Sequence, residues 1–155
     1  MRDKSSTPDD FANRFDSALA RLQVAVLDAC EREAQWPAKI AAAIHAALGF
    51  AAADPAAART LTVDALAQGG YGVRRRQRAI EHYAELLGAG APEDPRRPAI
   101  AEEIAVSAIA SILTERVYAG AERELPTLAP QLVEFVLIPY LGTEEAKAHA
   151  RRYRP

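Results

Sequence analysis

Apolar residues recur at spacings of three and four along almost the whole 155-residue chain, which is the periodicity of helices that bury one face. No segment shows the strict alternation of a half-buried strand. Of the 77 apolar residues, 35 are alanine, which is the strongest helix former and a poor strand former. The sequence therefore predicts an all-α protein.

Two helix starts are marked by a capping residue followed by proline, at Thr7-Pro8 and at Asp54-Pro55. The first predicts a long helix from Asp9 to about Glu33, roughly 37 Å in length at 1.5 Å per residue. Trp36-Pro37 either ends this helix or opens the next one, because a residue before proline avoids the helical region.

The length of the chain fits one domain with one hydrophobic core. We expect residues 1–8 to form a disordered polar head and residues 9–155 to form a single all-α domain. The glycines of residues 69–72 predict a break between helices, and the prolines of residues 91–98 predict a linker.

The charge and cysteine content narrow the function classes. The net charge of -2 disfavours a domain that binds nucleic acid, because neutralising many phosphates requires a basic surface. The one cysteine, Cys30, excludes an internal disulfide framework and a cysteine-based zinc site, and a reducing cytoplasm is the simplest compartment. The longest apolar stretch, residues 40–53, is shorter than the ~20 residues of a membrane span. We expect a soluble, cytoplasmic protein that does not bind a membrane.

Residues suited to catalysis are not arranged in a recognisable motif. His45, His82 and His149 lie far apart, without the spacing of metal ligands. The adjacent acids Glu102-Glu103 do not face each other on a helix and suit the positive end of its dipole. The arginine run at residues 74–78 is interpreted as a solvated helix face, with an anionic partner as the alternative. We expect neither an enzyme nor a cofactor nor a metal site.

The last third of the chain contains two segments, residues 104–113 and 128–141, that are apolar on nearly every face. A helix that is apolar all round must be covered all round, and a chain this short has little left to cover these two. We therefore expect a homodimer in which the two helices pack on the same pair of a second copy. The expected interface residues are Ile109, Leu113, Arg116, Val117, Leu132, Phe135, Val136, Pro139 and Tyr140.

Taken together, these features resemble the C-terminal effector-binding and dimerisation domain of TetR-family transcriptional regulators. The resemblance extends from about Asp10 to Ala146 and rests on the order and spacing of its parts. These parts are Phe11, Phe15, Leu19 and Leu22 on the opening helix, then Trp36, Ile40 and Ile44, then residues 53–59, 74–76, 83–87 and 125–130, and finally the segment LIPYLGTEEA at residues 137–146.

The resemblance implies a homodimeric sensor domain that binds a small apolar ligand among its helices. In the family, an N-terminal helix-turn-helix head binds DNA and a long connecting helix follows it. Because a separately folded head needs about 40 residues or more, we expect this chain to lack that head and not to bind DNA directly. The alternative function is a headless dimerisation partner that sequesters intact relatives.

The residues expected to line the ligand pocket are apolar or aromatic positions on the inner faces of the predicted helices. For each of them an ordinary core position is the alternative. They are Leu22, Val26, Trp36, Ile40, Ile44, Leu66, Tyr71, Ile80, Tyr83, Ala108 and Ile112.

Overall fold

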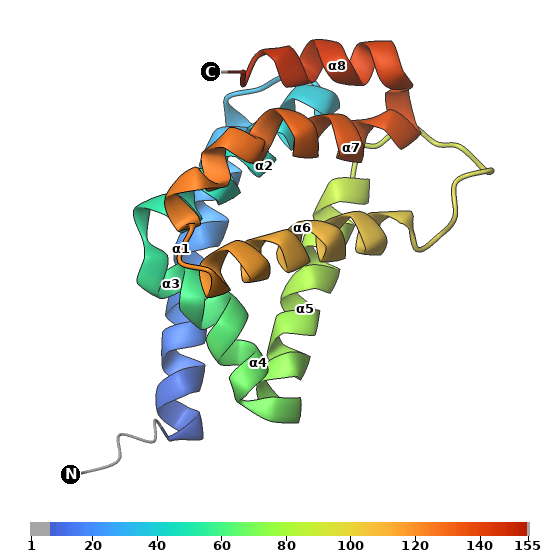
Figure 1. The fold of residues 1–155 in the computed structure, drawn as a ribbon. Helices are drawn as coiled ribbons and strands as arrows, with labels where there is room; N and C mark the ends of the chain where they lie inside the picture. The colour runs from blue at the N-terminus through green and yellow to red at the C-terminus, as the bar shows by residue number, and fades with distance from the viewer. Residues whose placement is uncertain (1–6, 155) are drawn as a thin grey trace.

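The computed structural model describes residues 7–154, and this part of the chain is built from helices joined by turns and one linker (Figure 1). No strand occurs among the described residues, so the prediction of an all-α fold is confirmed. The elements in chain order are α1 (Pro8–Glu31), α2 (Trp36–Ala53), α3 (Pro55–Arg59), the π-helix η1 (Thr60–Asp64), α4 (Ala65–Ala67), α5 (Gly69–Gly88), α6 (Ala101–Tyr118), the 3₁₀-helix η2 (Glu122–Leu128), α7 (Ala129–Leu141) and α8 (Thr143–Arg151).

Helix α1 begins where the capping signal predicts. The hydroxyl oxygen of Thr7 accepts a hydrogen bond of 3.2 Å from the backbone N–H of Asp10, and Pro8 occupies the first turn. The helix ends at Glu31, slightly before the predicted end. Trp36 opens the next helix. Of the head predicted at residues 1–8, residues 1–6 lie outside the described residues, and Pro8 already belongs to α1.

The main hydrophobic core forms where α2 packs against α7, and α8 covers α7 on the side away from α6 (Figure 1). Ile40 and Leu48 of α2 are buried together with Val133 and Leu137 of α7. Ala146 of α8 is also fully buried, because small residues let this short helix approach closely. The inner face of α7 is therefore covered within one copy of the chain.

A second, smaller cluster fixes the N-terminal half of α1. Phe11 and Phe15 are buried with Ala65 of α4. The rings of Phe11 and Tyr71 meet edge to face with centroids 6.4 Å apart, which ties α1 to the first turn of α5. The Arg75 guanidinium of α5 pairs with Asp16 of α1 just beyond this contact. The two helices are thus joined at their N-terminal ends.

The break between helices is shorter than the one predicted at residues 69–72. Only Gly69, with a φ of 61°, leaves the helical region, and α5 continues from there through Gly72. A Cβ atom at Gly72 would lie 2.0 Å from the backbone oxygen of Ala65. Glycine at this position therefore allows close packing of α4 on α5 rather than ending a helix.

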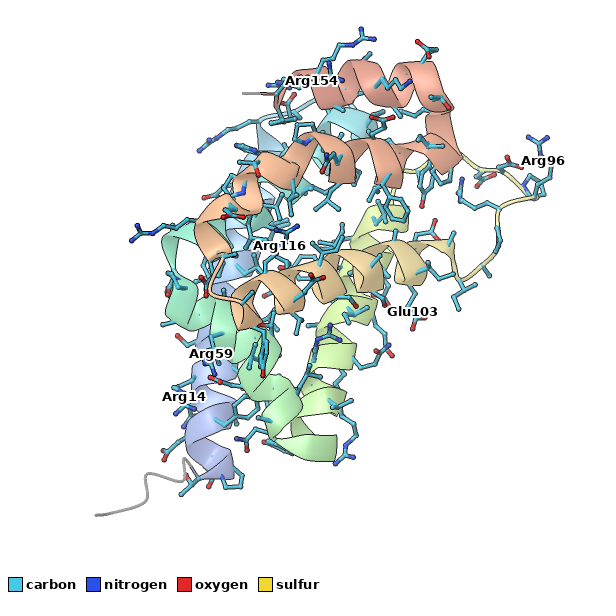
Figure 2. The ribbon with its side chains drawn as sticks, in the orientation of Figure 1. Arg14, Arg59, Arg96, Glu103, Arg116 and Arg154 are labelled. Atoms are coloured by element: carbon cyan, nitrogen blue, oxygen red, sulfur yellow. The ribbon has the colours of Figure 1, made fainter. Side chains whose placement is uncertain are left out.

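The linker predicted at residues 91–98 contains no helix, which confirms that prediction. Arg96 projects from it at the edge of the molecule and pairs with Asp94 (Figure 2). Beyond the linker, Figure 2 shows Glu103 where α6 crosses α5. The amide of Gln77 on α5 donates a hydrogen bond of 3.0 Å to the Glu103 carboxylate, so α6 is held to α5 at the crossing.

The π-helix η1 is a local departure that periodicity does not predict. The hydroxyls of Thr60 and Thr62 donate to the carbonyls of Ala56 and Ala58 at 3.1 and 2.7 Å. Such back-bonding by threonine competes with the regular helix ladder and distorts it. Leu61 and Thr62 of this segment line the space between α1, α5 and α6.

Within residues 7–154, one helix is long and apolar enough to cross a membrane by length and composition, namely α2. Its inner residues Ile40, Ile44 and Leu48 are buried against other helices of the same chain. The core helix of a globular domain meets the same criterion, and α2 occupies that position in this fold.

Candidate ligand-binding site

A cavity of about 340 Å³ lies among α1, α2, α5 and α6. Its wall is formed almost entirely by aliphatic and aromatic side chains, with η1 contributing Leu61 and α7 contributing Val136. The lining residues Leu27 of α1 and Leu86 of α5 are 48% and 37% exposed. The cavity therefore reaches the surface between the C-terminal halves of these two helices.

Seven of the predicted pocket residues line this cavity. They come from three helices whose apolar faces converge, which is the arrangement that helical spacing predicts. These residues are Leu22 and Val26 of α1, Trp36, Ile40 and Ile44 of α2, and Ile80 and Tyr83 of α5.

The other four predicted pocket residues lie elsewhere. Leu66 is 44% exposed, because the turn between α4 and α5 directs it outward. Tyr71 packs its ring on Phe11 outside the cavity. Ala108 and Ile112 of α6 do not line the wall, because α6 presents a different side to the cavity.

The side of α6 that lines the cavity carries Val106, Ile109, Leu113 and Val117, at the spacing of one helical stripe. Ile109, Leu113, Val117 and also Val136 of α7 belong to the predicted dimer interface. The structure places all four on the cavity wall, and Val117 and Val136 are each only 2% exposed. Because α6 is apolar on both sides, the sequence does not show which side faces inward.

Some residues that line the cavity were not predicted from the sequence. They lie on the same helical stripes as the predicted pocket residues. Phe15 and Leu19 precede Leu22 on α1, and Leu87 follows Tyr83 on α5. The i, i+3, i+4 spacing, followed over the full length of each helix, predicts these residues as well.

The few polar groups on the wall are half-buried. The indole N–H of Trp36 donates a hydrogen bond of 3.0 Å to the carbonyl of Leu87, and the Cys30 thiol contacts the Lys39 carbonyl at 3.5 Å. Burial raises the pKa of Cys30, so the thiol stays neutral. The hydroxyl of Tyr83 is buried without a hydrogen-bond partner among residues 7–154, and burial raises its pKa to about 12.

Two cationic side chains, Lys39 and Arg76, also line the cavity, whereas no aspartate or glutamate does. Arg76 makes no hydrogen bond or ion pair with any residue between 7 and 154. Desolvation by the surrounding apolar side chains lowers the pKa of this guanidinium. Within the same described range, no group of histidine, cysteine, aspartate or glutamate residues could hold a metal ion.

A second feature is a set of exposed large apolar side chains on α6 and α7, called the exposed apolar stripe below, which consists of Ile104, Tyr118, Phe135 and Ile138. Their exposed fractions are 54%, 78%, 49% and 38%. Pro139 is exposed beside Ile138. Exposed large apolar side chains that form a contiguous patch are typical of protein interfaces.

The remaining predicted interface residues make contacts within their own chain. Leu132 is buried in the core. Arg116 pairs with Glu124 at 3.7 Å. The Tyr140 hydroxyl donates a hydrogen bond of 2.8 Å to Glu102, and its ring packs on Trp36. Of the predicted interface, only Phe135 and Pro139 are exposed.

The described residues thus define an all-α domain with one apolar cavity among its first helices and an apolar outer face on its last long helices. No protein-family model matches the chain, and no curated protein or solved structure matches it either.

Proposed function

We propose that this chain is a sensor domain similar to those of TetR-family regulators, which binds a small apolar effector and forms a homodimer. The cavity among α1, α2, α5 and α6 is the observation that carries the proposal. Its volume of about 340 Å³ is within the range of ~300–1,000 Å³ typical of small-molecule sites, and its wall is apolar with few polar groups.

The presence of the cavity favours the sensor function over the alternative, a headless dimerisation partner. Protein interiors are close-packed, and an unfilled apolar space forfeits the contacts of its lining atoms. A chain that acted only through its outer surface would gain stability by closing the space with larger side chains. Alanines at positions 43, 47 and 110 instead leave it open.

Helix α1 is the element through which a ligand would act. It lines the cavity from Phe15 to Cys30, while its N-terminal end is held by Phe11 against α4 and α5. A ligand shifts such a helix only by binding more tightly to one of its positions than to another. The contacts of Phe11 with α4 and α5 would then transmit that shift to the N-terminal end of α1.

The exposed apolar stripe supports the homodimer. A second copy that presents the same stripe would cover Ile104, Tyr118, Phe135 and Ile138 about a two-fold axis. We propose no catalytic activity for this chain, since the cavity wall carries no pair of groups suited to acid–base chemistry. We propose no direct DNA binding either, since the net charge of -2 does not suit a surface that neutralises phosphates.

A panel of small apolar compounds tests the proposal through the melting temperature of the protein. A compound that binds only the folded state raises the melting temperature with concentration. We expect at least one apolar compound of suitable size to do so, and equally concentrated sugars and amino acids to have no effect. If no member of a broad apolar panel raised the melting temperature, the proposal would be rejected.

A further inference from the structure

The charged side chains of the cavity wall are all cationic. The chain as a whole has a net charge of -2 and contains 21 acidic residues against 19 lysines and arginines. The cavity wall nevertheless carries Lys39 and Arg76 and no acidic side chain. A cavity meant for a neutral hydrocarbon would have no use for either cation.

Arg76 is the more informative of the two cations. Its neighbour Arg75 on the same helix has both an acidic and an aromatic partner, because it pairs with Asp16 and lies over the ring of Tyr71. Within residues 7–154 Arg76 has neither, although it is partly buried and lines the cavity together with Ala79 and Ile80. Burying a charge without a partner is unfavourable, so this guanidinium gains most from an anion brought in by a ligand.

The shape of the guanidinium indicates which class of anion Arg76 would bind. Arginine presents a planar fork of N–H donors that matches the two oxygens of a carboxylate, whereas lysine acts as a point charge. The rest of the wall can accept only an apolar body. We propose that the ligand of this cavity is an apolar molecule with a single carboxylate, and that the Arg76 guanidinium binds this carboxylate. The inference rests on the proposed sensor function and specifies its ligand class.

Isothermal titration with a matched pair of probes tests the inference. Decanoate and decanol share the same apolar chain and differ in the charged end group. The wild-type protein should bind decanoate more tightly than decanol. In Arg76→Gln the affinity for decanoate should fall about tenfold or more, the effect of losing one charge-assisted hydrogen-bonded pair, while the affinity for decanol changes by less than about threefold.

Three further variants serve as controls. Arg78→Gln removes an exposed arginine of the same helix that does not line the cavity, and it should leave both affinities unchanged. Arg76→Lys keeps the charge and should retain part of the preference for decanoate. If Lys39→Gln lowered the decanoate affinity as much as Arg76→Gln is expected to, the assignment of the carboxylate to Arg76 would be wrong.

The outcomes separate this inference from the proposed function. If the wild-type protein bound both probes equally and Arg76→Gln changed neither affinity, the cavity would remain a ligand site but the carboxylate would be excluded. If neither probe bound and the apolar panel also had no effect on the melting temperature, both the inference and the sensor function would be overturned.

Discussion

The indole N–H of Trp36, in the first turn of α2, donates a hydrogen bond of 3.0 Å to the backbone carbonyl of Leu87, in the last turn of α5. The last carbonyls of a helix have no partner within the helix itself. This bond therefore satisfies one end of α5 and joins it to α2 across the cavity. The Trp36 ring also packs on Tyr140 of α7, with centroids 4.8 Å apart.

Replacing this tryptophan tests its role as a tie between helices. Trp36→Phe keeps an aromatic ring but removes the donor, and it should lower the free energy of unfolding by about 1–2 kcal/mol. Urea denaturation followed by circular dichroism measures the change. Val24→Ala is the control, because Val24 of α1 is 60% exposed and its substitution should have almost no effect. Equal stabilities of Trp36→Phe and the wild type would show that the bond contributes nothing.

The unpartnered hydroxyl of Tyr83 predicts a dependence of stability on alkaline pH. Because burial raises the pKa of Tyr83 from 10 to about 12, the folded state holds this proton more tightly than the unfolded state does. The corresponding stability is fully present below pH 10 and is lost as the pH rises from about 10 to about 12. Tyr83→Phe cannot ionise and should lose less stability over this interval.

Denaturation curves of the two proteins on either side of pH 10 measure the difference. Near neutral pH, Tyr83→Phe should be as stable as the wild type or up to about 1 kcal/mol more stable, because it removes a buried hydroxyl that has no partner. A Tyr83→Phe protein that is clearly less stable at neutral pH would indicate that the hydroxyl is hydrogen-bonded.

Filling the cavity tests whether it is a binding site. Ala43 of α2 lines the cavity, and Ala43→Leu places additional apolar atoms in it. We expect the ligand-free protein to be stabilised by about 0.5–2 kcal/mol and the apolar ligand to bind at least tenfold more weakly. Ala20→Leu, on the exposed side of α1, is the control and should change neither quantity. Unaltered ligand binding by Ala43→Leu would place the ligand elsewhere.

The exposed apolar stripe can be tested by inserting a charge. Phe135→Asp should give a folded monomer, because a second copy would have to bury an unpaired carboxylate at a cost of several kcal/mol. Val24→Asp introduces the same charge at a residue that is 60% exposed on α1 and should remain dimeric. Light scattering at micromolar concentration gives the mass of each protein. A Phe135→Asp protein of dimeric mass would exclude this stripe as the interface.

Val136 shows that the effect of an inserted charge depends on whether it lies on the exposed or the buried face of α7. From the sequence, Phe135 and Val136 are both predicted to lie in the interface. In the structure Val136 is 2% exposed and contributes to the core and the cavity wall. Val136→Asp should therefore unfold the protein rather than separate two copies.

The local signals in the sequence predict the helices well, because they depend on neighbouring residues alone. Thr7 caps α1, and the Asp54 carboxylate accepts a hydrogen bond of 3.0 Å from the backbone N–H of Ala57 at the start of α3. Asp54 also pairs with Arg21 of α1, and both interactions lower the pKa of its carboxyl group. The capping signal predicts the first contact, whereas the second depends on tertiary packing.

The rotation of a helix about its own axis is predicted less well when both of its sides are apolar. The stripes on α1 and α5 are one-sided, and Leu22, Val26, Ile80 and Tyr83 were predicted from them as pocket residues. On α6 the choice between Ile109 and Ile112 as cavity residues depends on how α5, α3 and η1 pack around it. The π-helix at Thr60–Asp64 likewise depends on threonine hydroxyls that bond to the preceding turn.

Contact quenching of Trp36 tests the central claim most directly, because Trp36 is the only tryptophan and lines the cavity. Bromodecanol carries a bromine atom that quenches indole fluorescence on contact. We expect saturable quenching with one binding site per chain, strongly reduced in Ala43→Leu and preserved in Ala20→Leu. Quenching that rises linearly without saturation, and equally in all three proteins, would contradict the existence of a ligand site in this cavity.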